Sequence, residues 1–523
     1  MNYITTKSTM ASGQGLYKSP AVCPPTEDDL QKLSEELNLK CTTEEIQAIT
    51  AQFKSTATSY QRLSELPEPA LPVKYPRVPG YRPAENDNPY NAWSWKCDIK
   101  GAATGRLAGK TVGIKDNIAV AGVPMMNGSK ILEGYVPEFD ATVVTRVLDA
   151  GGRILGKTAC EDLCYSGCSS TCSSGPVRNP VDETRTVGGS SSGSAALVAG
   201  KVVDMAIGGD QGGSIRIPAS WSGIVGIKPT WGLVPYTGAM PIELTVDHLG
   251  PMAANVHDCA LLLEVLAGYD EGRDPRQPRD LKSEPYTTLL DKGISGKKIG
   301  LLQEGFSNCT EQDVAEMVEQ AALTLAKAGA KVEKVSVPMH LDSLAIWTGV
   351  AMQGAYNNMI LGNGNGYQWK GYYATSLQEA FFRGHRTRPY DNSKAVKRLC
   401  LTGEYMNRNY GNKFYAKGQN LTTVLTQAYD KVLQEYDVLI LPTLPYKATK
   451  LLQADCSTTD YIETASTMLI NTAAADSTGH PALSINAGNI EGLPVGMMIM
   501  GRHFDETTVL QVARAFEKIR DGK

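Results

Sequence analysis

The sequence predicts an α/β protein with a largely parallel or mixed sheet, covered on both faces by helices and preceded by a small helical segment. Short apolar runs alternate with amphipathic ones from residue 111 to the end of the chain, which is the pattern of layered α/β folds. A chain of 523 residues with 42% hydrophobic content can also bury a large core. A proline-rich stretch separates this region from the helical start.

Residues 1–66 are expected to form the helical segment. Thr26 precedes a first helix, and Thr42 precedes a second in which Glu45 stands at the capping-box position. Leucines and isoleucines recur at helical spacing after both starts. Two such helices bury too little surface to be a domain, so we expect them to pack on the rest of the chain or on a second copy of it, and we predict a homodimer.

Residues 67–89 are expected to form an extended connector, because they contain seven prolines, which fix φ and remove backbone donors. Residues 90–523 then form the main domain. Tyr90, Trp93 and Trp95 follow the prolines and are interpreted as an anchor that holds the connector to this domain.

The main domain is expected to alternate strands with helices. The predicted strands are Thr111–Lys115, Arg153–Gly156, Met205–Gly208, Ile224–Ile227, Lys298–Leu302, Val438–Leu441, Leu483–Ile485 and Gly496–Met500. The predicted helices are Ala141–Ala150, His257–Leu266, Gln312–Ala328, Thr422–Glu435 and Thr507–Lys518. Residues 341–419 are rich in aromatic side chains and are expected to be less regular.

Composition argues against several classes of function. The net charge is −4 and no long basic cluster occurs, so neither nucleic acid nor an anionic membrane surface is expected as a partner. The first 15 residues lack the apolar core of a leader, and no apolar run is long enough to span a membrane, which favours a cytoplasmic location. Eleven cysteines, an odd number, do not suggest a disulfide framework.

Cys160, Cys164, Cys168 and Cys172 recur at every fourth residue. On a continuous helix they would form a stripe of thiols that could bind a soft metal ion. Glycine and serine interrupt this stretch, however, so the helix is not expected to persist. We therefore interpret these cysteines as small buried apolar side chains and predict no metal site.

Two glycine–serine loops stand out, Gly188–Ser194 and Gly208–Ser214, separated by one short apolar helix and one strand. Glycine tolerates backbone angles that side chains forbid, which lets neighbouring N–H groups point at one oxygen atom. Hydroxyl groups from both loops can then converge on one place. This arrangement is typical of a nucleophilic site with an oxyanion-binding nest.

With these loops, GGSSSGS and GGDQGGSIRIPAS, the segments GIKPT (residues 226–230) and GIKDN (113–117) make the chain resemble the amidase signature family, serine hydrolases of carboxylic amides. The resemblance covers about residues 92–518 and is closest to stand-alone bacterial acylamide amidases. It implies that residues 90–523 form one catalytic domain around a large mixed sheet, and that neither a metal nor an organic cofactor takes part.

The resemblance implies a Ser-cisSer-Lys triad of Lys115, Ser190 and Ser214. Lys115 closes an apolar strand, where burial favours the neutral amine that can act as a base. Ser190, held by a cis peptide bond, would relay a proton from Ser214 to Lys115, and Ser214 would attack the amide carbonyl. Ser191 is expected to hydrogen-bond the lysine.

The backbone N–H groups of Gln211, Gly212, Gly213 and Ser214 are expected to bind the tetrahedral oxyanion. Gln211 stands where the family often has threonine or isoleucine, and Ser192 where it often has glycine. Neither change removes a triad group. Gln211 is placed to contact substrate, which leaves the specificity open.

Three alternatives remain. Residues 189–193 satisfy the G-x-S-x-G elbow of α/β-hydrolases with Ser191 as nucleophile, although polar loop residues, rather than a buried strand, precede them. A carbamate (urethane) hydrolase would use the same triad. An amidotransferase component that supplies ammonia within a complex would have the same signature.

Overall fold

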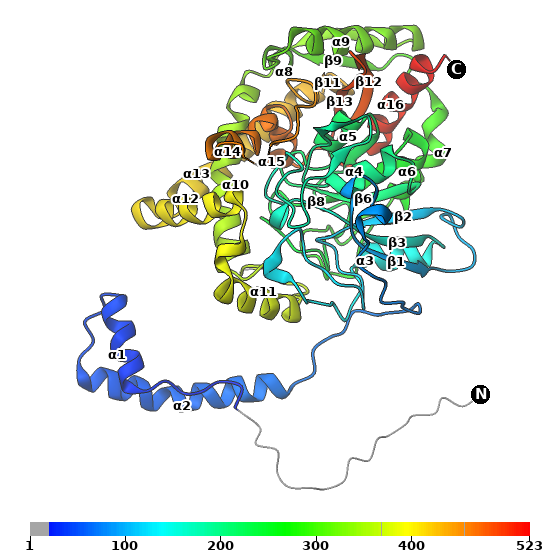
Figure 1. Cartoon of the computed structure of the whole chain (residues 1–523). Helices are drawn as coiled ribbons and strands as arrows, with labels where there is room; N and C mark the ends of the chain where they lie inside the picture. The colour runs from blue at the N-terminus through cyan, green and yellow to red at the C-terminus, as the bar shows by residue number, and fades with distance from the viewer. Residues whose placement is uncertain (1–19, 368, 454, 523) are drawn as a thin grey trace. The chain divides into compact units, whose positions relative to one another are not determined.

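The computed structural model describes residues 20–367, 369–453 and 455–522. The first 15 residues, which suggested a chain without a leader, lie outside this range. The chain divides into two units, Met1–Ala70 and Leu71–Lys523, and each is described by itself (Figure 1).

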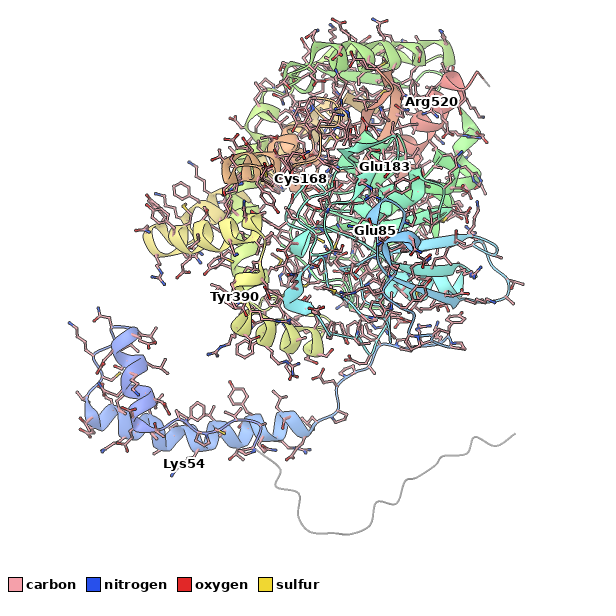
Figure 2. All side chains as sticks on the ribbon, in the orientation of Figure 1. Lys54, Glu85, Cys168, Glu183, Tyr390 and Arg520 are labelled. Carbon is pink, nitrogen blue, oxygen red and sulfur yellow. The ribbon has the colours of Figure 1, made fainter. Side chains whose placement is uncertain are left out.

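The first unit contains two helices, α1 (Glu27–Glu36) and α2 (Thr43–Glu65). Each begins with a complete capping box: Thr26 with Asp29, and Thr42 with Glu45. Both predicted helix starts are therefore confirmed. The helices pack on each other over a small area, in which Ile46 is the buried apolar residue, and side chains such as Lys54 on α2 point to solvent (Figure 2).

The second unit is built on an 11-stranded mixed sheet, in the order β1-β3-β2-β6-β8-β7-β12-β13-β11-β9-β10. The pairs β2/β3, β2/β6, β9/β10 and β9/β11 are parallel, and the other six are antiparallel. The predicted mixed sheet is confirmed. Its strands are β1 (Trp93–Lys100), β2 (Thr111–Lys115), β3 (Arg153–Thr158), β6 (Met205–Asp210), β7 (Val225–Lys228), β8 (His248–Ala253), β9 (Lys298–Leu302), β10 (Lys331–Val335), β11 (Val438–Pro442), β12 (Ala482–Ile490) and β13 (Leu493–Gly501).

Helices cover both faces of the sheet, and the strand side chains alternate between two cores. On β11, Val438 and Ile440 join the core formed with α3 (Thr142–Asp149), α6 (Val256–Leu266), α9 (Gln312–Leu323) and α16 (Glu506–Arg520). Leu439 and Leu441 point to the other face, toward α10 (Ser343–Ala355), α13 (Lys413–Leu433) and α15 (Ala473–Thr478). The short helices α4 (Ser192–Ala199) and α5 (Arg216–Ser222) also pack on the sheet (Figure 1).

The structure corrects two parts of the sequence interpretation. Strands β1, β8 and β10 were not predicted; residues 248–253 of β8 include glycine and proline, which obscure the strand signal. Trp93 and Trp95 lie on β1, and Trp95 Nε1 donates to the carbonyl of Pro79 over 2.8 Å, which agrees with an anchor for the connector. The region 341–419 is largely helical and contains α10, α11 (Thr375–Thr387), α12 (Lys394–Tyr410) and the start of α13. Its mixed aromatic and polar composition hid the helical period. Among the helices described, none combines the length and the apolar character that a membrane crossing requires.

Candidate active site

The sheet brings the predicted site residues to one edge. Strands β2 and β6 are parallel neighbours, with Ile114 beside Ile207, so the ends of both strands lie at the same edge. Lys115 is the last residue of β2, and β6 continues into the loop that carries Ser214. The loop before α4 carries Ser190, whose peptide bond with Gly189 is cis, as predicted.

Lys115 and Ser190 are in direct contact. Both are fully buried, and Lys115 Nζ donates to Ser190 Oγ over 2.8 Å and to the carbonyl oxygen of Gly209 over 3.1 Å. Within the residues described, Lys115 has no carboxylate within ion-pair distance. Its nitrogen is therefore directed at a serine hydroxyl at a distance suited to proton transfer.

Ser191 plays a different part from the expected one. Its hydroxyl accepts from Gly209 N and donates to Gly209 O, both over 3.1 Å, and it does not bond the lysine. Ser191 N also donates to the carbonyl of Ser214 over 3.2 Å. Ser191 thus joins the two glycine–serine loops and shares the Gly209 carbonyl with Lys115, so its effect on the lysine is indirect.

The loop around Ser214 presents fewer oxyanion donors than the sequence suggested. The N–H of Gly213 donates to Asp210 Oδ1 over 2.7 Å and is not available, which corrects its assignment. In the part of the chain that the structure describes, no protein acceptor takes the N–H of Gln211, Gly212 or Ser214. Ser214 itself is 7% exposed, so it can be reached from solvent.

The directions of two of these free N–H groups, those of Gly212 and Ser214, are fixed by their own peptide carbonyls. A trans peptide points its C=O and N–H in opposite directions. The carbonyl of Gln211, which shares a peptide with Gly212 N, accepts from Trp347 Nε1 over 2.6 Å. The carbonyl of Gly213, which shares a peptide with Ser214 N, accepts from Ile217 N over 2.7 Å.

A buried ion network supports this loop. Asp210 accepts from the N–H groups on both sides of Ser214, those of Gly213 and Ile215, and from the guanidinium of Arg216. Arg216 is fully buried and also pairs with Asp476 at 2.6 Å. Asp210 and Arg216 therefore form a structural ion pair, and burial keeps Arg216 from contact with a substrate carboxylate.

The pKa values of the two carboxylates in the network shift in opposite directions. Burial opposes ionisation of Asp210, but the charge of Arg216 outweighs it and holds the pKa of Asp210 well below its usual range. Burial, with the nearby charge of Asp210, raises the pKa of Asp476 well above its ordinary value.

An apolar cavity of about 340 Å³ opens beside Ser214. It is lined by Gln211 and Gly212, by Cys164, and by apolar side chains that include Ile242, Val246, Leu344, Trp347, Met352 and Leu469. Gln211 Nε2 donates to Tyr236 Oη over 3.0 Å, while Gln211 Oε1 is buried without a protein partner. The site therefore combines a hydroxyl, free amides and one unused acceptor with an apolar wall.

Cys164 is a site residue that the sequence analysis missed. It lines the cavity and lies beside Lys115 and Ser190, while its thiol donates to Asn127 Oδ1 over 3.1 Å. Burial would raise the pKa of Cys164, but hydrogen bonding with Cys160 and the charge that Lys115 carries when it is protonated outweigh burial and lower this pKa. The every-fourth-residue spacing of the cysteines did not predict this position, because the single helical turn Asp162–Cys164 ends at Cys164.

Comparisons with known proteins agree with this geometry. The family model described as "Amidase" matches residues 90–510. An enantioselective amidase of Rhodococcus rhodochrous is 44% identical over 506 residues, which are 95% of this chain and 96% of the relative. A glutamyl-tRNA(Gln) amidotransferase subunit of Methanosarcina mazei is 40% identical over 419 residues, 80% of this chain and 86% of the relative. The structure of a peptide amidase from Stenotrophomonas maltophilia matches with a TM-score of 0.65 at 29% identity and covers 79% of this chain and 83% of that one. The chain therefore belongs to the amidase signature family and is an amidohydrolase.

Proposed function

We propose that this amidohydrolase cleaves small carboxylic amides to the acid and ammonia or an amine through an acyl-enzyme on Ser214. The observation that carries the proposal is the contact of Lys115 Nζ with Ser190 Oγ, next to the loop on which Ser214 lies beside two free N–H groups. A serine hydroxyl is a weak nucleophile until a base takes its proton.

In the proposed mechanism, Ser214 Oγ attacks the amide carbonyl and passes its proton to Ser190 Oγ, while the proton of Ser190 moves to neutral Lys115. The amides of Gly212 and Ser214 bind the oxyanion. Loss of one such donor raises the barrier by about 2.7–4 kcal/mol in other hydrolases. Ser190 then protonates the leaving nitrogen. Water releases the acid from Ser214 by the reverse of these steps.

The cavity supports an apolar acyl group, aliphatic or aromatic, as the preferred substrate. Gln211 Oε1 is proposed to accept an N–H of the substrate amide, because it is buried at the cavity and lacks a partner. The Rhodococcus relative is described as enantioselective. We extend that property to this chain, because an acyl pocket walled by Trp347 and branched side chains can distinguish two enantiomers.

A stand-alone enzyme is favoured over an amidotransferase component. The alignment with the Rhodococcus amidase covers 95% of this chain, so it must include most of the segment before residue 90. The alignments with amidotransferase subunits cover only about 80% of the chain. One observation supports the second candidate: Arg398 lines the cavity and has no ion-pair partner among the described residues, so it can bind the α-carboxylate of a substrate such as glutamine. A carbamate hydrolase with the same triad is the third candidate.

The test is ammonia release by the purified full chain from aliphatic amides, benzamide, ethyl carbamate and L-glutamine. We expect turnover of the apolar amides that Ser214→Ala abolishes, and an acyl adduct on the peptide with Ser214 in quenched wild-type reactions. Ser192→Ala is the matched control, because Ser192 Oγ is buried in the neighbouring loop without a partner. An adduct on Ser191 would refute the triad; turnover of glutamine alone would favour the amidotransferase.

We also propose a homodimer. Leucines on and after α1 and α2, including Leu33, Leu37, Leu39 and Leu63, are exposed. Several exposed apolar side chains on one small helical unit are a common mark of an interface. Light scattering after gel filtration is expected to give twice the mass of 56.3 kDa, and a monomer after removal of residues 1–66. A full-length monomer would refute this proposal.

A further inference from the structure

Two histidines and one aspartate meet away from the serine site. Asp430 lies on α13, His480 precedes β12, and His503 follows β13. Asp430 Oδ1 is 3.0 Å from His480 Nε2 and 3.6 Å from His503 Nδ1. One ligand atom from each residue lies within 4.8 Å of the other two.

Hydrogen bonds on the far side of each ring determine where its proton sits. His480 Nδ1 lies 2.9 Å from Thr478 Oγ1, and that hydroxyl already donates its only proton to the carbonyl of Ala474. Thr478 Oγ1 must therefore accept, and His480 Nδ1 carries the hydrogen. His503 Nε2 lies 2.8 Å from the carbonyl of Thr478, which can only accept, so His503 Nε2 carries its hydrogen too.

In their neutral forms, both rings then direct a bare nitrogen at the same carboxylate oxygen. Three acceptors that face one another repel unless a cation lies between them. The ring of His480 is fully buried, where a charge on it would be poorly solvated. The centroids of the two rings lie 3.8 Å apart with their planes tilted by 33°, so two protonated rings would place like charges close together.

We propose that Asp430, His480 and His503 form a binding site for a divalent transition metal ion, for which Zn²⁺ is the best match. Two imidazole nitrogens and one carboxylate oxygen form a known zinc ligand set, with bonds of about 2.0–2.2 Å. Ligand atoms around such an ion lie about 3.3 Å apart, which the distances of 3.0 and 3.6 Å bracket. A hydrogen bond at the ring nitrogen that does not bind the ion, which fixes the tautomer, is also typical of metal-binding histidines.

The surroundings fit a site with an open coordination position. Asp430 and His503 line a cavity of about 630 Å³, and their side chains are 47% and 31% exposed. An ion can therefore enter from solvent and keep a water molecule. Its three ligands come from α13 and from the connections before β12 and after β13, so the ion would join these segments.

The test uses metal-stripped full-length protein and Zn²⁺, with bound metal measured by equilibrium dialysis and stability by thermal melting. We expect one ion per chain in the wild type and a raised Tm. Asp430→Asn and His503→Gln, both at partly exposed positions, are expected to lose that ion. Thr478→Val removes the acceptor behind His480 and is expected to weaken binding by about 10–100-fold.

His257→Gln is the matched control, because His257 is exposed on α6, outside the cluster, and its variant is expected to bind Zn²⁺ like the wild type. Titration with Co²⁺ separates the site from adventitious thiols, since thiolate ligands add a charge-transfer band that imidazole and carboxylate do not. A wild type that binds no ion would overturn the proposal. Equal binding by wild type, Asp430→Asn and His503→Gln would overturn it as well.

Discussion

Replacing Lys115 by methionine tests the proposed base most directly. Methionine keeps the unbranched shape of the side chain and removes the nitrogen that contacts Ser190 Oγ at 2.8 Å. General base catalysis contributes about 10²–10⁴-fold to a rate. We expect kcat for a small amide to fall by about 10³-fold, which corresponds to about 4 kcal/mol in the barrier.

The fold is expected to survive this change. The Gly209 carbonyl still accepts from Ser191 Oγ at 3.1 Å, so only the Ser190 hydroxyl loses its partner. A buried polar group without a partner costs about 1–3 kcal/mol. Removing the buried amine relieves its desolvation and offsets part of that cost, so we expect the free energy of unfolding to change by less than about 2 kcal/mol.

The assay measures kcat and KM from ammonia release, and the free energy of unfolding from urea melts of the same samples. Lys228→Met is the matched control: Lys228 is also fully buried, but its nitrogen donates to Pro229 O and His248 Nε2 and contacts neither serine. The control is expected to keep the wild-type kcat. A folded Lys115→Met protein that retains more than about a tenth of the wild-type kcat would refute the role of Lys115 as the base.

Three further changes test the loop and its surroundings. Trp347→Phe removes the donor to the Gln211 carbonyl and is expected to lower kcat by about 10–100-fold for every substrate, less than the loss of a whole oxyanion donor; an unchanged kcat would contradict the orienting role. Asp210→Asn and Asp476→Asn together are expected to lower the free energy of unfolding by more than the sum of the single changes, because either carboxylate can pair with Arg216; simple additivity in urea melts would contradict this. The pKa of Asp247 is raised to about 7, chiefly by burial, so the folded state binds this proton more tightly than the unfolded state. The proton on Asp247 contributes fully to the free energy of unfolding below about pH 4, and this contribution is lost as the pH rises through 7. Asp247→Asn should remove about 4 kcal/mol of this pH dependence. If the free energy of unfolding of wild type and variant changes with pH in parallel, the pKa shift is contradicted.

The sequence predicted the sheet well wherever a strand is buried and apolar. Thr111–Lys115 was predicted with the bounds of β2, because its apolar run is short and ends at a lysine. Residues 341–419 were misread, because α10 is apolar around most of its surface and shows no single stripe, while the buried stripe of α12, which includes Val396, Leu399 and Gly403, lies among charged side chains. The helical period was present there, but aromatic residues and glycines obscured it.

The parts of the candidate site that lie in short sequence motifs were predictable from the sequence. The order of Lys115, Ser190 and Ser214 along the chain allowed their convergence to be inferred, and the structure brings Lys115 and Ser190 into contact. Partners from distant segments could not be inferred. Asp476 and Thr472 reach the Ser214 loop from more than 250 residues away, and Cys164 reaches it from a turn whose spacing suggested a helix.

The loop Asp210–Ser214 depends on the rest of the domain for its conformation. Two of its free N–H groups, those of Gly212 and Ser214, keep their directions because the opposite ends of their peptides are bound elsewhere, one by Trp347 and one by Ile217. The intervening N–H, that of Gly213, is held by Asp210, and the Gly212 carbonyl in the same peptide accepts from Thr472. A glycine-rich segment by itself would sample many such arrangements. The fold selects one by supplying an acceptor or donor to each peptide group that must not face the substrate, which leaves two donors in place before any oxyanion forms.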